Sequence, residues 1–124
     1  MTGEKNEVGN TNLLSRIYTN NFMMDISNLQ KQIYQNKIDK GFNVTDIGKE
    51  IILMTEELGE LAKAYKNSDK KSASEINNKE EIIDAIGDLM VYCLGLCEMI
   101  GADSGEILEK IIEGNKIRKH TGQM

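Results

Sequence analysis

The stretch IGKEIILMTEELGELAKAY, residues 47–65, decides the fold. Its apolar residues recur at alternating steps of four and three, which is the spacing of residues on one face of an α-helix. A stripe of this length predicts a helix that packs along another helix. The stripe consists of Ile47, Ile51, Met54, Leu58, Leu61 and Tyr65.

A second stretch, IIDAIGDLMVYCLGLCEMI at residues 82–100, repeats the same spacing. Additional apolar residues widen its stripe nearly all round, so we expect this helix to be the buried one. Ser72 and Glu75 have the spacing of a capping box, which predicts a helix start near them, after a polar loop at about residues 66–74. The stripe consists of Ile82, Ile86, Leu89, Cys93, Leu96 and Ile100.

Two further helices flank this pair. One is expected from Asp25 to a C-terminal glycine at Gly41, and the other after Gly101, capped by Asp103 or Ser104. Four helices with short connections predict an all-α, antiparallel four-helix bundle. Residues 1–24, rich in Asn, Thr and Gly, are expected to form an N-terminal extension to a helical domain at 25–124.

Length and composition narrow the class of protein. A chain of 124 residues forms one small domain, which gains from pairing with a second copy, so we expect a homodimer or homotetramer. A net charge of −5 argues against nucleic-acid polymers as partners. The sequence shows neither a membrane span nor a signal peptide's apolar core, so a cytoplasmic protein is expected. Cys93 and Cys97, four residues apart, are expected to be buried, reduced thiols.

Three acids occupy one stripe of the helix predicted to be buried. Glu81, Asp84 and Asp88 fall within a sector of about 60° at 100° per residue. An ionised carboxylate is costly to bury unless it is paired or bound to a cation. The stripe therefore indicates a counter-cation.

The preceding helix supplies a second acidic group, because Glu56, Glu57 and Glu60 flank its packing stripe. In an antiparallel pair the two groups would meet as one oxygen-rich site. Oxygen ligands favour Mg²⁺, with Mn²⁺ as a substitute, and Mg²⁺ completes its shell with water and substrate phosphates. The sole histidine, His120, lies in the tail, which argues against a di-iron bundle. The alternative is an ordinary solvated acidic face.

The stretches TEELGELAKAY (55–65) and EEIIDAIGDLMVYCLGL (80–96) resemble the MazG-like all-α nucleoside triphosphate pyrophosphohydrolases. That family carries Glu-Glu-x-x-Glu on one helix and Glu-x-x-Asp on the next. The first half is met here. In the second half, Asp88 takes the place of the terminal Asp and Ala85 stands where the family has Glu, so Asp84 is the favoured replacement and Glu81-x-x-Asp84 the alternative register.

The resemblance implies hydrolysis of nucleoside or deoxynucleoside triphosphates to the monophosphate and pyrophosphate. It implies Glu57, Glu60, Asp84 and Asp88 as metal ligands. A further ligand or catalytic base would come from Glu56 or Glu81. The basic tail resembles the family's segment that approaches phosphates, and together with the second helix it gives these candidate phosphate contacts: Lys63, Lys116, Arg118 and Lys119.

Two alternatives remain open at this point. The first is a non-catalytic helical interaction or regulatory module that has lost activity, which Ala85 favours. The second is a hydrolase of narrow substrate range, such as one for dUTP or phosphoribosyl-ATP. The tyrosines at 18, 34, 65 and 92 do not decide which base is bound.

Overall fold

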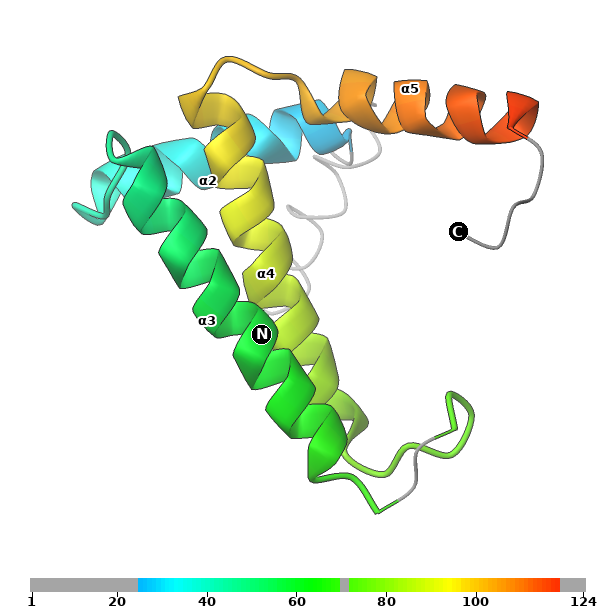
Figure 1. Ribbon diagram of the computed structural model, residues 1–124. Coiled ribbons are helices and arrows are strands. Elements are labelled where there is room, and N and C mark those ends of the chain that lie inside the picture. Colours follow the sequence, from blue (N-terminus) through cyan, green and yellow to red (C-terminus); the bar gives the residue numbers. More distant parts are fainter. Residues whose placement is uncertain (1–24, 70–71, 119–124) are drawn as a thin grey trace, which may run out of the picture.

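A computed structural model describes residues 25–69 and 72–118, and these residues form four helices and no strand. The all-α class is confirmed and is consistent with a four-helix bundle (Figure 1). The predicted extension at 1–24 lies outside the described residues. The helices are α2 (Ile26–Asp39), α3 (Ile47–Lys66), α4 (Lys79–Met99) and α5 (Ser104–Ile117).

An antiparallel hairpin of α3 and α4 forms the long arm of the molecule (Figure 1). α2 packs against α4 at the end of the hairpin where α3 begins and α4 ends. α5 turns away from α4 by 106° and packs against α2. Because α5 points away from α4, it does not cover the side of the hairpin next to it.

Glycines end α2 and α4 in the same way. Gly41 and Gly101 have φ values of 71° and 76°, in the left-handed region that favours glycine. At the first, the amide of Phe42 donates to Lys37 O (2.9 Å) and that of Gly41 to Ile38 O (3.1 Å), which is a Schellman motif. Both glycine ends predicted from the sequence are confirmed.

Gln30 joins three helices at the angle. It is almost fully buried, and its Nε2 donates to Glu98 Oε1 of α4 and to the Ala102 carbonyl, both at 2.8 Å. Its Oε1 accepts from the amide of Ser104 at the start of α5, also at 2.8 Å. Of the two predicted caps of α5, Asp103 is the one observed, and its side chain accepts a hydrogen bond from the Glu106 amide. These bonds set the direction in which α5 leaves.

The start predicted for α4 was wrong. Ser72 and Glu75 form a turn, in which the Glu75 amide donates to Ser72 O at 3.1 Å, and α4 begins at Lys79 after Asn78. The Asn78 side chain donates to the Ala64 carbonyl at 2.7 Å, which ties the loop to the end of α3. The capping-box spacing of Ser72 and Glu75 therefore belongs to a turn within the loop and does not mark a helix start.

The packing stripe predicted for α3 coincides only in part with its buried face, since Met54 and Leu61 of that stripe are half-buried. Ile51 and Leu58 of that stripe are exposed, whereas Glu50 and Ala64 are buried. The contact face is therefore rotated from the most apolar one. This leaves an apolar stripe of α3 on the surface.

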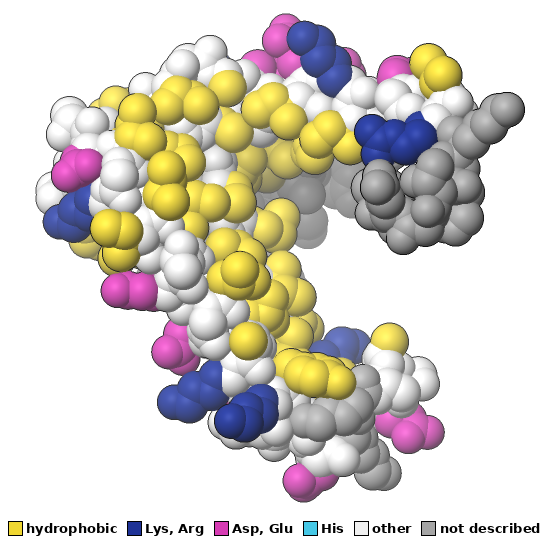
Figure 2. Space-filling model, in the orientation of Figure 1, with side chains coloured by type: hydrophobic (Ala, Val, Ile, Leu, Met, Phe, Trp, Pro, Cys, Tyr) yellow, Lys and Arg dark blue, Asp and Glu magenta, His cyan; other side chains and the backbone are white. Residues whose placement is uncertain are grey.

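The burial predicted for α4 is also wrong within one protomer. Ile83, Met90 and Val91 are exposed, and of the two free cysteines Cys93 is exposed and Cys97 half-buried. For Met90 and Cys93 the reason is that α5 diverges and leaves their face of α4 uncovered, whereas Val91 borders a hollow between α4 and α3. Figure 2 shows hydrophobic side chains gathered along α4 and the inner side of its angle with α5.

Within the described residues, no helix on its own has the length and apolar character to cross a membrane; only the bent pair of α4 and α5 meets that criterion when the two are taken together.

Candidate active site

A cleft of ≈ 490 Å³ lies between α3, α4 and the end of α2. Its volume is in the range of small-molecule sites. Acidic, basic and aromatic side chains share it, so it differs from an ordinary apolar crevice. The cleft is lined by Lys37, Gly41, Phe42, Asn43, Lys49, Glu50, Leu53, Glu57, Asp88, Val91 and Tyr92.

Glu57 and Asp88 bring acids of the two predicted groups to this one cleft. Glu57 is half-buried on α3 and Asp88 is exposed on α4. Acids of two helices therefore share one cleft at these two positions, while the meeting of the complete acidic groups stays a prediction. Carboxylates that lie close together repel, and a cation between them would relieve that repulsion.

The pKa of the Tyr92 phenol is raised by burial and by three acids, two of which are Glu57 and Asp88. Burial raises its pKa first, and the negative charges of Glu57, Asp88 and Glu56 raise this pKa further. All three carboxylates therefore act on one hydroxyl group. The hydroxyl remains protonated at neutral pH and is available as a hydrogen-bond donor.

Glu60 and Asp84 lie at the next level of the hairpin. Glu60 is one turn after Glu57 and Asp84 one turn before Asp88; because α3 and α4 run antiparallel, both steps lead toward the 67–78 loop. Both side chains are exposed, and neither lines the cleft. Their predicted role as ligands stays a prediction.

Glu81 occupies the first turn of α4, nearer the loop. Its Oε2 accepts a hydrogen bond from Asn78 Nδ2 at 3.2 Å, and the side chain is exposed. In this position it supports the start of α4. Its predicted part in catalysis also stays a prediction.

A divalent cation needs several oxygen ligands. Within residues 25–69 and 72–118, no group of three or more Asp, Glu, His or Cys side chains is arranged to hold a metal ion. Mg²⁺ is commonly held by one or two carboxylates together with substrate phosphates and water, without a complete protein cage. Glu57 and Asp88 fit that mode of binding.

Ala85 occupies the position where the MazG-like pattern has Glu. It is 7% exposed, and Ala64 and Ala85 are the buried hydrophobic side chains among the described residues. A glutamate here would enter a packed surface. In this chain the acids on either side, Asp84 and Asp88, are the ones that remain accessible.

A buried ion pair that the sequence analysis did not predict lines the cleft. Lys37 of α2 and Glu50 of α3 pair there and are 6% and 1% exposed. Burial alone lowers the pKa of Lys37, and the adjacent Glu50 carboxylate opposes that shift by favouring the charged form. The only available signal was that Glu50 lies seven residues before Glu57, on the same helix face.

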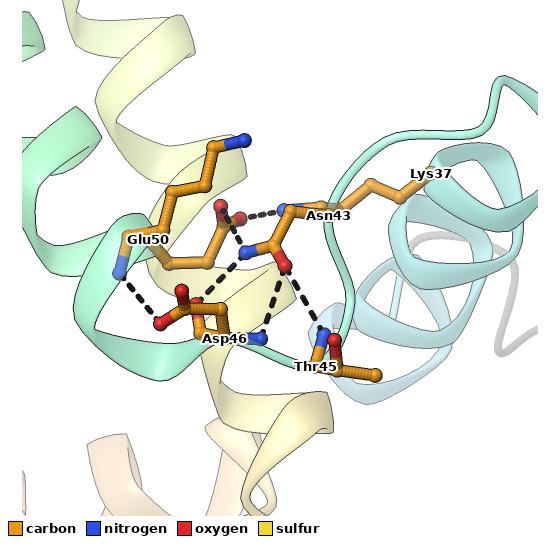
Figure 3. Close-up of polar contacts among 6 residues, drawn as sticks. Lys37, Asn43, Thr45, Asp46 and Glu50 are labelled. Carbon is orange, nitrogen blue, oxygen red and sulfur yellow. Dashed lines mark hydrogen bonds and ion pairs between the residues drawn. The ribbon is translucent and has the colours of Figure 1, made fainter.

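The loop between α2 and α3 holds this pair in place (Figure 3). Asn43 Nδ2 donates to Glu50 Oε2 (3.1 Å) and to the Asp46 carbonyl (2.8 Å), while its Oδ1 accepts from the Asp46 amide (3.0 Å). Asp46 then caps α3 by accepting from the Lys49 amide at 3.1 Å. Asn43 thus links the start of α3 to the wall of the cleft.

The predicted phosphate-binding cations that the structure describes do not line the cleft. Lys63 is exposed in the last turn of α3, Lys116 pairs with Glu113 at 3.0 Å, and Arg118 is exposed at the end of α5. Lys119 lies outside the described residues. The described cations that do line the cleft are Lys37 and Lys49.

Comparison with known proteins identifies the family. The family model for phosphoribosyl-ATP pyrophosphohydrolase matches residues 22–115, which is most of the chain and includes α2, α3 and α4. Searches of curated proteins and of solved structures give no significant match. The resemblance seen in the sequence is confirmed: the chain belongs to the phosphoribosyl-ATP pyrophosphohydrolase family, which falls within the MazG-like all-α superfamily and comprises hydrolases that act on a phosphoanhydride.

Proposed function

We propose that this protein hydrolyses the phosphoanhydride between the α- and β-phosphates of a nucleoside triphosphate group, with Mg²⁺ as cofactor and the nucleoside monophosphate and pyrophosphate as products. The observation that carries the proposal is the meeting of Glu57 and Asp88 on one cleft in a chain of this family. Phosphoribosyl-ATP contains such a triphosphate group and is one substrate that the proposal includes.

A bound cation would supply a more acidic water and would neutralise charge on the phosphates. Glu57 and Asp88 would hold it from opposite helices. Glu60 and Asp84, one level further along the hairpin, would extend the same acidic track once phosphates are present. Glu56, which is exposed beside Glu57 and does not line the cleft, would accept a proton from the attacking water.

The remaining walls of the cleft suit the rest of the nucleotide. Phe42, 60% exposed at the rim, offers an aromatic face, and Leu53 and Val91 add apolar surface. Lys49 supplies an exposed ammonium at the same rim. Such a mixture of apolar walls and a few charged groups is typical of sites for phosphorylated small molecules.

The test is product formation with Mg²⁺ from each NTP, each dNTP and phosphoribosyl-ATP, comparing the wild type with Asp88→Asn. The amide keeps the size of the side chain and removes its charge, so we expect a fall in kcat/KM of at least about 100-fold. Glu109→Gln on α5, exposed and away from the cleft, is the matched control and should retain wild-type turnover.

Three outcomes decide the matter. Pyrophosphate released by the wild type and lost in Asp88→Asn supports the proposal. Equal turnover by both removes Asp88 from the site. No product from any substrate, and no rise in melting temperature on addition of Mg²⁺, would instead identify a non-catalytic helical module.

A further inference from the structure

The Lys37–Glu50 pair is a feature that the proposed reaction does not use. Both side chains are almost fully buried, and Glu50 accepts hydrogen bonds from Lys37 and, at 3.1 Å, from Asn43. Ion pairs are costly to remove from water, and apolar residues of similar size often stabilise a fold equally well. A position maintained at this cost calls for a role beyond packing.

Lys37 reaches the pair by crossing α4 at a glycine. A Cβ on Gly95 would stand 3.3 Å from Lys37 Cδ and 3.4 Å from Nζ, so a side chain there would crowd the lysine. The ammonium then lies over the ring of Tyr92, 5.4 Å from its centroid. This distance is within the range of a cation–π contact.

Tyr92 connects this buried pair to the acids of the cleft. It comes one helical turn after Asp88 on α4, and its side chain lines the same cleft as Asp88 and Glu57. One face of the ring is held by Lys37. A carboxylate has only acceptor atoms, so an O–H that lines the same cleft can donate its one hydrogen bond to either Glu57 or Asp88.

We propose that Tyr92 is a positioning residue whose O–H donates to one carboxylate of the Glu57–Asp88 pair and sets the pair for the divalent cation, while the Lys37–Glu50 pair sets the ring of Tyr92. The inference rests on the proposed function for the identity of the cation. It assigns roles to three residues, Tyr92, Lys37 and Glu50, outside the acidic motifs. No bond is made or broken by them.

The first test is Mn²⁺ binding without nucleotide, measured by electron paramagnetic resonance on the full chain. Tyr92→Phe keeps the ring over Lys37 and removes only the hydroxyl, so we expect the Kd for Mn²⁺ to rise about tenfold or more with the helical circular dichroism unchanged. Tyr34→Phe, half-buried on α2 and outside the cleft, is the control and should bind as the wild type. Wild-type affinity in Tyr92→Phe would overturn the proposal.

The second test asks whether the ion pair acts through Tyr92. Lys37→Met combined with Glu50→Gln removes both charges without leaving one unpaired. It should weaken Mn²⁺ binding in the wild-type background and add little to the loss in the Tyr92→Phe background. Losses that multiply in full would overturn this link, since a general loosening of the fold acts whether or not the hydroxyl is present.

A third measurement does not require the combined variant to fold. Mn²⁺ should change the ultraviolet absorption of tyrosine in the wild type and in Tyr34→Phe but not in Tyr92→Phe, because the metal rearranges the acceptors of that hydroxyl. If Tyr92→Phe gave the same Mn²⁺ difference spectrum as the wild type, the inference would be contradicted. Cation binding that depends on Tyr92 in a chain that hydrolyses no nucleotide would refute the proposed function alone, so the two failures are distinguishable.

Discussion

At the residue scale, the buried charges matter most. Lys37 and Glu50 satisfy each other, and Asn43 gives Glu50 a second donor at 3.1 Å. Removing one partner leaves an uncompensated charge in a site that is 1% exposed at Glu50. Removing both avoids that penalty.

Lys37→Met alone should therefore lower the free energy of unfolding by about 3–5 kcal/mol. Glu50→Gln added to it should recover most of that loss, because the neutral amide no longer needs a cation. Urea unfolding followed by circular dichroism measures both variants. A double variant as unstable as the single one would show that the lysine stem, and not its charge, carries the stability.

This pair also shows where sequence reasoning stops. The acids of the site could be found because they share helix faces three and four residues apart. Lys37 and Glu50 are thirteen residues apart, on different helices, and meet only because the chain reverses at Gly41. Periodic spacing along the sequence does not predict a contact between two helices that a turn brings together. The sequence places Tyr92 on a helix, but it does not predict which side chains surround its ring.

At the scale of helices, periodicity predicted the elements better than their faces. All four helices occur where the apolar steps of three and four place them, because that spacing follows from helix geometry. The partner of each face does not follow from it. α3 buries Glu50 and Ala64 while Ile51 and Leu58 stay exposed. Hydrogen bonds made by Asn43 and Asn78 to these two buried residues are contacts that apolar spacing does not record.

The glycine ends of the helices give a test at this scale. Gly101→Ala should destabilise the fold by about 1–2 kcal/mol, because φ at this position is 76° and a side chain is strained there even though no atom lies within 4 Å. Gly114→Ala, in the interior of α5 with equally open surroundings, should stabilise it by about 0.5–1 kcal/mol. Urea midpoints of the two variants should move in opposite directions; equal shifts would contradict the explanation.

At the scale of the whole molecule, the uncovered apolar face of α4 and α5 is the main feature (Figure 2). Ile86, Met90, Ile107 and Ile111 are all exposed on it. Monomers seldom expose contiguous apolar surface of this kind. We propose that a second copy of the chain covers this face, as a homodimer or a pair of dimers. Helices of the second copy would then fill the angle between α4 and α5 and complete the bundle.

Met90→Glu should weaken this association, because a dimer would bury an unpaired carboxylate. Sedimentation equilibrium should show an oligomer for the wild type and a shift toward monomer for the variant. Gln32→Glu, an equal change of charge on the exposed side of α2, should leave the mass unchanged. A wild type that is monomeric at all concentrations would refute the proposed assembly.

The central claim is that Glu57 and Asp88 serve one cation, and a double-mutant cycle on kcat/KM tests it most directly. Groups that act as a unit are non-additive, so Glu57→Gln and Asp88→Asn should each lower kcat/KM at least about 100-fold, and the double variant by about the same factor. Losses that multiply in the double variant, or full activity in either single one, would contradict the account.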